Sequence, residues 1–203
     1  MNTWIKRAAA AAGIVAAIAL PMSGLASDGT ITFNGAVTAS SCSIDVDGSG
    51  NGDGTVTLPT VDTAALTNGA AKTDAGGKFF YITLSGCSAA SDLGAASPGG
   101  TAPTTVQIYF EAGPNVDETT GGLINVAAGG YKSNVEVKLY NASNSAVVGT
   151  QITPGHDTVQ APVQTIGSEA QQWFYAGYST EAAATAATAG TVSTSVTYSI
   201  KYN

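Results

Sequence analysis

An acidic, glycine-rich stretch holds the side chains of this chain that are best suited to bind a metal ion. Asp45, Asp47 and Ser49 are spaced as the first three ligands of an EF-hand calcium loop. The twelfth position of that loop, which requires a bidentate carboxylate, is Val56. Because this ligand is missing, we interpret the stretch to Asp53 as a hairpin loop and predict no metal site. A calcium-binding loop stays open as the alternative.

Residues that could support catalysis are few. His156 is the only histidine, and it lies in the segment Thr153–Asp157, whose Pro and Gly residues are typical of a turn. The sequence contains no nucleophile elbow, HExxH zinc motif or phosphate-binding loop. Serine and threonine are too abundant for a Ser/His/Asp arrangement to be inferred from them. We therefore predict that the protein is not an enzyme and needs no cofactor.

Two cysteines, Cys42 and Cys87, complete the set of reactive side chains. They form no CxxC redox motif, and together with one histidine they cannot supply four zinc ligands. An even number of cysteines in an exported protein favours a structural disulfide. Pairing them closes a loop of 45 residues, which loop-entropy arithmetic values at about 4 kcal/mol.

The N-terminus has the features of a secretory signal peptide. Lys6 and Arg7 precede the apolar stretch Ala8–Leu20, and a small-x-small cleavage site ends at Ala26. Thirteen apolar residues are too few to cross a bilayer, and no later stretch of the sequence is longer and as apolar. We assign Met1–Ala26 to the signal peptide and expect no lipid-spanning segment after cleavage. The remaining 177 residues have the size of a single domain.

The charge of the mature chain argues against one class of partner. Without Lys6 and Arg7, five lysines stand against 14 acidic residues, which gives a net charge of −9. Proteins that bind phosphate backbones cluster Lys and Arg on one surface. We therefore expect no nucleic-acid partner.

Alternating apolar residues predict many short strands. The clearest runs are Phe80–Leu84, Val106–Phe110, Val135–Leu139 and Phe174–Tyr178, with shorter ones at Thr55–Leu58 and Ala146–Ile152. Connectors rich in Gly, Pro, Ser and Asn separate these runs. The pattern predicts an antiparallel β-sandwich. A single helical turn is expected at Asp62–Asn68, with Asp62 as its cap.

The last fourteen residues, Gly190–Asn203, alternate without interruption. One side of this segment consists of Val192, Thr194, Val196, Tyr198, Ile200 and Tyr202. Strict alternation of β-branched and aromatic residues predicts a long, half-buried strand. Chain ends normally fray unless they are tied down. We therefore interpret this terminus as a docking strand.

The mature N-terminus shows a similar pattern. Gly29, Ile31 and Phe33 share one face of the segment Ser27–Asn34. Such a segment can pair within its own sheet, or it can leave the domain and add a strand to another molecule. The alternation alone does not decide between these two arrangements.

Taken together, these segments resemble the subunits of chaperone–usher fimbriae, the type 1 and P pilus family. Gly190 and the penultimate Tyr202 frame the C-terminal alternation as in those pilins, and Gly29–Val37 precedes Cys42 as a donor segment does. Two inner runs, Asn134–Leu139 and Phe174–Tyr178, resemble middle strands of the same family. The resemblance covers nearly the whole mature chain, and it is the order and spacing of the pieces that is specific.

The resemblance implies an all-β, immunoglobulin-like antiparallel β-sandwich that lacks its final strand. A donor strand from another subunit would complete it. The implied domains are the signal peptide 1–26, an N-terminal donor-strand extension 27–34 and a pilin domain 35–203. The implied donor residues are Gly29, Ile31 and Phe33. The implied chaperone-binding and groove residues of the C-terminal strand are Gly190, Val192, Val196, Tyr198, Ile200 and Tyr202.

The implied function is structural. The chain would be a subunit, the major one, of a surface filament for adhesion, exported through the periplasm with the help of a chaperone and an outer-membrane usher. Its partners in the filament would be identical or related pilins, joined by donor-strand exchange, and a Cys42–Cys87 bridge would tie the first strand to its neighbour. Two alternatives stay open here. One is a minor or tip pilin that binds carbohydrate as an adhesin, and the other is a secreted, self-complete β-sandwich that binds carbohydrate or calcium.

Overall fold

The computed structural model describes residues 42–66, 76–87, 105–129, 133–156, 164–165, 170–180 and 186–202. The chain divides into two compact units, Met1–Phe33 and Asn34–Asn203, and every described residue belongs to the second unit. The expected signal peptide and donor segment lie outside the described residues.

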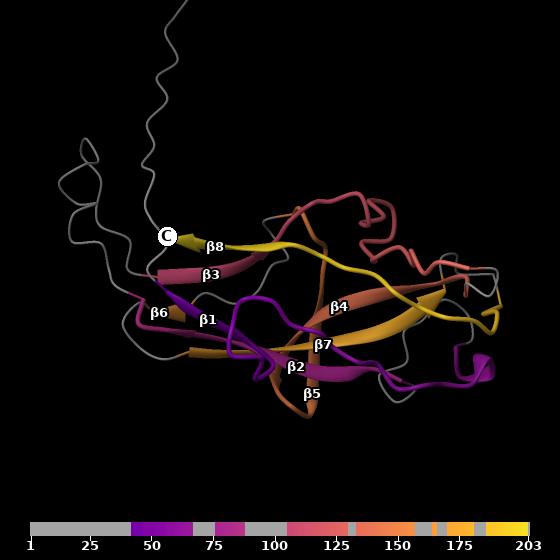
Figure 1. Ribbon diagram of the computed structural model, residues 1–203, viewed down its shortest axis with the longest axis horizontal. Helices are drawn as coiled ribbons and strands as arrows, with labels where there is room; N and C mark the ends of the chain where they lie inside the picture. The colour runs from indigo at the N-terminus through magenta and orange to yellow at the C-terminus, as the bar shows by residue number, and fades with distance from the viewer. Residues whose placement is uncertain are drawn as a thin grey trace, which may run out of the picture. The chain divides into compact units, whose positions relative to one another are not determined.

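Within the described residues the chain forms two antiparallel sheets (Figure 1). The larger sheet has the order β1-β2-β7-β4-β5, and the smaller one has the order β6-β3-β8. The strands are β1 (Ser43–Val46), β2 (Lys78–Ser85), β3 (Thr105–Phe110), β4 (Val135–Asn144), β5 (Val147–Ile152), β6 (Gln164–Thr165), β7 (Ala170–Thr180) and β8 (Tyr198–Tyr202). The predicted antiparallel β-sandwich is confirmed.

The observed strands differ from the predicted ones in two places. Thr55–Leu58 belongs to no ladder, and of Gly190–Asn203 only β8 pairs in a ladder, with β3. Burial alternates along Thr55–Leu58 and along Thr191–Tyr198, whereas every residue of β8 is half-buried. Alternation records which side chains face the core, whereas a ladder also requires a neighbouring strand. Among the described residues, both segments therefore show strand-like burial over a stretch where they form no ladder.

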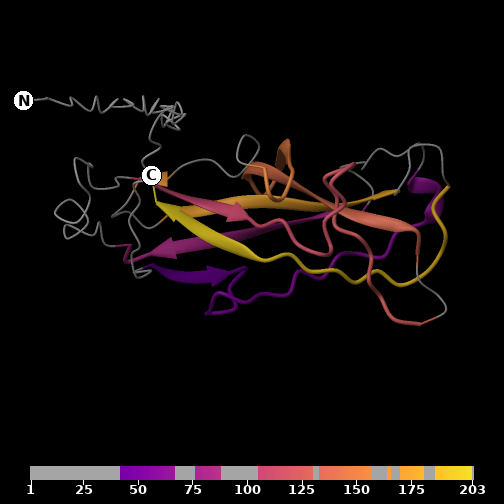
Figure 2. The ribbon, with the colours of Figure 1, turned by 90° about the horizontal axis from the view of Figure 1, so that it is seen from above.

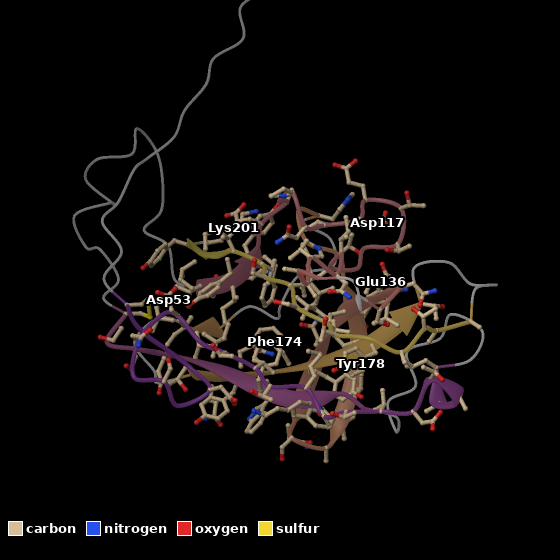
Figure 3. The ribbon with its side chains drawn as sticks, turned by 45° about the vertical axis from the view of Figure 1, so that its right-hand side comes forward. Asp53, Asp117, Glu136, Phe174, Tyr178 and Lys201 are labelled. Atoms are coloured by element: carbon tan, nitrogen blue, oxygen red, sulfur yellow. A yellow bond between two sulfur atoms is a disulfide. The ribbon has the colours of Figure 1, made fainter. Side chains whose placement is uncertain are left out.

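Phe174 joins the two sheets at the centre of the core (Figure 3). Its ring is fully buried and lies 5.4 Å from the ring of Phe80 in the same sheet and 5.2 Å from the ring of Phe110 in the facing sheet. Buried residues from both sheets surround this cluster, among them Ile82, Leu84, Val106, Ile108, Leu139 and Ile152. The alternation read from the sequence therefore places one face of each sheet in a common core.

Two local features fix the first part of the chain. A disulfide joins Cys42, just before β1, to Cys87, just after β2, at the end of the ladder that pairs these two strands. The 3-10 turn η1 (Thr63–Ala65) begins after Asp62, whose carboxylate accepts a hydrogen bond from the Ala64 N–H at 2.8 Å. Asp62 is thus the cap that the sequence predicts, for a shorter turn than expected.

We expect Phe174→Ala to lower the free energy of unfolding by about 3–5 kcal/mol, because the truncation removes a fully buried ring and leaves a cavity between the sheets. Urea unfolding of the purified subunit measures this change. Val147→Ala is the control, since Val147 is 53% exposed, and its effect should stay within about 0.5 kcal/mol. Equal losses for the two variants would contradict this assignment of the core.

Candidate functional site: a strand-acceptor groove

A groove of about 700 Å³ runs between two extended segments that belong to no ladder along most of their length. One wall is Val192–Tyr198, here called the C-terminal wall, and the other is Gly52–Leu58, here called the opposite wall. Figures 1 and 2 show the two segments, in yellow and indigo, on the same side of the sandwich. The floor consists of core residues from both sheets: Phe80, Ile82, Phe110, Leu123, Val137, Leu139, Ala176 and Tyr178. We call this feature the strand-acceptor groove.

Side chains of the C-terminal wall alternate between the groove and solvent. Val192, Thr194 and Val196 are half-buried, whereas the residues between them are exposed. The apolar members pack against the core without being fully covered. This is the burial expected of a strand whose neighbour on one side is missing.

The two backbone edges of the C-terminal wall are not equivalent. The outer edge is paired: the carbonyls of Thr191, Ser193 and Thr197 accept hydrogen bonds from the N–H groups of Ser133, Val126 and Glu111, at 3.1, 2.8 and 2.9 Å. In an extended segment, successive residues direct their backbone groups to opposite edges.

The inner edge carries the backbone groups of the alternate residues of the C-terminal wall. The N–H and C=O groups of Val192, Thr194 and Val196 face the groove, and no described residue pairs with them through its backbone. Backbone groups in folded proteins are almost always paired. The geometry thus provides an edge that can accept one more strand.

The opposite wall approaches the core closely because it contains glycines. A Cβ atom on Gly54 would lie 2.3 Å from Cγ1 of Val46, so a larger residue there would displace the wall. Val56 and Leu58 pack against the core from this wall. One hydrogen bond crosses the groove: the hydroxyl of Tyr198 donates to the carbonyl of Gly52 at 2.5 Å. Burial, and secondarily the charge of Asp53, raises the pKa of this Tyr198 hydroxyl.

A second cavity, of about 540 Å³, continues the groove away from β8. Tyr178 and Val192 line both cavities. The second cavity is bounded by Thr60–Thr63 on one side and by Ala187–Val192 on the other. An added strand can therefore run past the end of the C-terminal wall.

The loop that supports the outer edge is fastened over a buried acid on β4. Thr120 Oγ1 donates a 2.6 Å hydrogen bond to Glu136, whose side chain is 1% exposed, and Lys138 Nζ lies 3.4 Å from the other carboxylate oxygen. A Cβ on Gly122 would lie 2.4 Å from this carboxylate, so glycine is required for the approach. Burial raises the pKa of the Glu136 carboxyl, although Thr120 and Lys138 oppose the shift.

The residues predicted from the sequence fall into three groups. Val192, Val196 and Tyr198 line the strand-acceptor groove, and Gly190 lines the second cavity. Ile200 and Tyr202 lie in the β8 ladder, opposite Ile108 and Val106, and the Tyr202 hydroxyl is 3.4 Å from Sγ of Cys42. The proposed donor residues Gly29, Ile31 and Phe33 lie outside the described residues.

The side chains that could bind a metal ion or take part in catalysis do not come together in a site within the described residues. Within the described ranges, no three His, Cys, Asp or Glu side chains converge on a possible metal position. Asp47 forms a 3.0 Å ion pair with Lys78, and Asp45 accepts a hydrogen bond from the Gly50 N–H. His156 is exposed in a turn closed by its N–H and the Thr153 carbonyl. None of the helical structure in this part of the chain is long and apolar enough to cross a membrane.

Residues 58–203, which include all strands from β2 onward, match the family model FimA, described as Type-1 fimbrial protein, A. The chain belongs to this family. The major fimbrial subunit SMF-1 of Stenotrophomonas maltophilia (strain K279a) is 36% identical to this fimbrial protein over 187 residues, which cover 91% of the chain and 98% of the relative. The F17 fimbrial protein of Escherichia coli is 34% identical over 190 residues, 94% of the chain and 95% of the relative.

The fold of this fimbrial protein is also similar to that of a solved chain from a chaperone-usher pilus. The two align over 87% of this chain and 96% of that one, with a TM-score of 0.53 and 19% sequence identity. At this identity the likeness concerns the fold, and it supports the immunoglobulin-like sandwich expected from the sequence.

We expect Thr194→Val to stabilise the isolated subunit by about 1–3 kcal/mol. Thr194 Oγ1 is buried in the C-terminal wall without a hydrogen-bond partner, so replacing the hydroxyl by a methyl group removes an unsatisfied polar atom. Urea unfolding measures the effect, and Thr197→Val, on the exposed side of the wall, is the control. A destabilised Thr194→Val variant would show that the hydroxyl is paired in solution.

We expect Glu136→Gln to flatten the pH dependence of stability. The folded-state pKa of this carboxyl lies above its ordinary value of 4.5, so the folded protein binds this proton more tightly than the unfolded chain. The resulting stabilisation is fully present below about pH 4.5 and is lost as the pH rises through the folded-state pKa. Urea midpoints of both proteins between pH 4 and pH 7 provide the measurement, and the neutral Gln variant should gain most, relative to the wild type, at the upper end. Parallel curves would contradict this assignment.

Proposed function

We propose that this fimbrial protein is a structural subunit, the major one, of a chaperone–usher fimbria and that it polymerises by donor-strand exchange. The observation that carries the proposal is the inner edge of the C-terminal wall, which has no backbone partner among the described residues and lies over an apolar groove. A strand added to this edge gains backbone hydrogen bonds, and its alternate side chains fill the groove. The filament grows because each subunit lends a strand to one neighbour and accepts a strand from the other.

The strand to be lent is the N-terminal extension. In this proposal Met1–Ala26 is removed as a signal peptide, Ser27–Asn34 leaves its own domain, and residues 35–203 accept the extension of the next subunit. Ile31 and Phe33 would enter the groove as bulky apolar side chains, in contact with floor residues such as Phe80 and Leu139. Gly29 would pass where the backbone must approach closely, since it has no side chain.

The same edge explains why a chaperone is part of the proposal. An apolar groove with an open strand edge promotes aggregation unless something covers it. A periplasmic chaperone would cover the groove with a strand of its own and hold the β8 end of the chain at Ile200 and Tyr202. At the outer-membrane usher, the extension of the next subunit would replace the chaperone strand, and the finished fimbrium would stand on the cell surface.

The likeness to relatives supports a structural role in preference to an adhesin at the tip or an enzyme. The two relatives are a major fimbrial subunit and a fimbrial protein, and each matches this chain over at least 95% of its own length. A tip adhesin would need a receptor-binding site in addition to the groove. The C-terminal wall and the floor of the groove lie within residues 58–203, the part of the chain that matches the fimbrial family model.

Two full-length variants, each defective in one half of the exchange, test the proposal. Val196→Lys places a charge in the acceptor groove but leaves the extension intact, whereas Ile31→Asp with Phe33→Asp spoils the extension but leaves the groove intact. Neither variant should form fibres alone. A mixture of the two should form a heterodimer that survives SDS before boiling, because unfolding of strand-linked complexes is slow.

Thr197→Lys is the matched control for the groove variant. Thr197 is next to Val196 but lies on the exposed side of the wall, so this lysine should leave fibre formation intact. Fibres from the double Asp variant alone, or a mixture that stays monomeric, would overturn donor-strand exchange between subunits.

A further inference from the structure

Three asparagine side chains form hydrogen bonds to the outer edge of residues 186–195, here called the C-terminal segment together with the rest of the chain to Tyr202. This part of the segment belongs to no strand ladder. Asn134 Nδ2 donates to the Ala186 carbonyl at 3.0 Å, and its Oδ1 accepts from the Thr188 N–H at 2.7 Å. Asn115 Nδ2 donates to the Ser195 carbonyl at 3.3 Å and to the Ser195 hydroxyl at 3.1 Å. Between these two lies Asn125, which bonds to the backbone of Thr191 and Ser193.

Asn125 uses the full hydrogen-bonding capacity of its amide. Its side chain is completely buried. Nδ2 donates to the carbonyls of Ser133 and Thr191, each at 2.8 Å, and Oδ1 accepts from the N–H groups of Ala127 and Ser193, each at 3.0 Å. An asparagine amide has two donor hydrogens and two acceptor lone pairs, so all four are occupied. Two carbonyls on one side and two N–H groups on the other also fix the orientation of the amide.

This arrangement has a consequence for the groove. Asn125 binds the Thr191 carbonyl and the Ser193 N–H on the outer edge. Because successive residues of an extended segment direct their backbone groups to opposite edges, the N–H and C=O groups of Val192 and Thr194 point toward the groove. A segment held in its paired conformation before its partner arrives loses less conformational freedom when the partner binds. The buried amide thus prepares the far end of the C-terminal wall, where the groove meets the second cavity.

We propose that Asn125 is a positioning residue for strand capture: it acts only when the subunit accepts a strand, by holding Thr191–Thr194 extended with its inner edge open. The proposal rests on the function proposed above. It also gives Asn125 a role that differs from general stabilisation of the fold, because the four hydrogen bonds of its amide go to Ala127, Ser133, Thr191 and Ser193 and thus serve the accepting half of the exchange.

Asn125→Asp is the substitution that tests the proposal most directly. It keeps the shape of the side chain and its acceptor oxygen, but it removes both donor hydrogens and places a carboxylate oxygen against the carbonyls of Ser133 and Thr191. Asn144→Asp is the matched control. Asn144 uses only its Oδ1, which accepts from the Ala146 N–H in the turn between β4 and β5, and aspartate can replace it there.

The test uses the two complementary full-length variants and measures how fast they form the SDS-resistant heterodimer. Asn125→Asp in the accepting partner, which carries Ile31→Asp and Phe33→Asp, should slow the reaction at least about tenfold. The same substitution in the donating partner, which carries Val196→Lys, should leave the rate unchanged. Asn144→Asp should be neutral in both partners.

Each outcome decides the matter. Equal slowing in both partners would show a merely structural role, and an unchanged rate in the accepting partner would show no role, so either result overturns the proposal. If Asn125→Asp does not fold, Asn115→Ala provides the second variant, and its expected effect is a smaller slowing that is again confined to the accepting partner. If the parent pair forms no heterodimer, donor-strand exchange itself fails, which is distinct from a failure confined to the Asn125 variants.

Discussion

The inner edge of the C-terminal wall is the constraint on which the rest of this structure depends. A strand between two neighbours pairs both of its edges, but among the described residues the backbone partners of the C-terminal wall, Glu111, Val126 and Ser133, all lie on one side. The side chains beneath the other edge are core residues. A strand added at this edge would therefore extend the sheet and cover the core at the same time. Hydrogen bonding and hydrophobic burial therefore demand the same occupant, a strand with alternating apolar residues.

The two ends of the C-terminal segment are held in different ways. At the β8 end the support is the backbone ladder with β3, in which Ile200 lies opposite Ile108. The Tyr202 hydroxyl also lies 3.4 Å from Sγ of Cys42, which the disulfide joins to Cys87. At the other end the support is polar and comes from buried amide and hydroxyl groups around Asn125 and Ser133. An apolar residue in place of Asn125 would remove the acceptor of the Ser193 N–H, although the carbonyls of Thr191 and Ser193 would keep their backbone donors.

Much of the fold could be predicted from the sequence, since β2 and β3 alternate in burial and bury the predicted face. The predicted runs in β4 and β7 are strands as well, although residues of their opposite face, such as Glu136 and Tyr175, are also buried. The short strands β1 and β6 were missed, as runs of four and two residues contain too little of the pattern. The alternation of apolar residues could not predict the groove. Alternation in Gly190–Asn203 indicates burial, but the absence of a neighbour is a property of the folded chain.

The supporting asparagines were missed for a related reason. Asn115 and Asn125 lie in connectors that contain several glycines, where asparagine is ordinarily a turn residue, and Asn134 begins a run that resembles a strand. No local signal distinguishes a turn asparagine from one that bonds to a segment more than fifty positions away, as Asn125 does with Thr191. A search of the sequence for chemistry therefore finds carboxylates, histidine and cysteines, and passes over the amides that shape this site.

The same geometry also limits the hazard of an open edge. Exposed strand edges invite unspecific pairing, and proteins restrict them by making them short or by covering their ends. Here the hydrogen bond from Tyr198 to Gly52 crosses the groove at its β8 end, and beyond the second cavity the opposite segment turns away through η1. Only the stretch between these points offers both a free backbone edge and an apolar floor. A strand must match that stretch in length and in alternation to gain both.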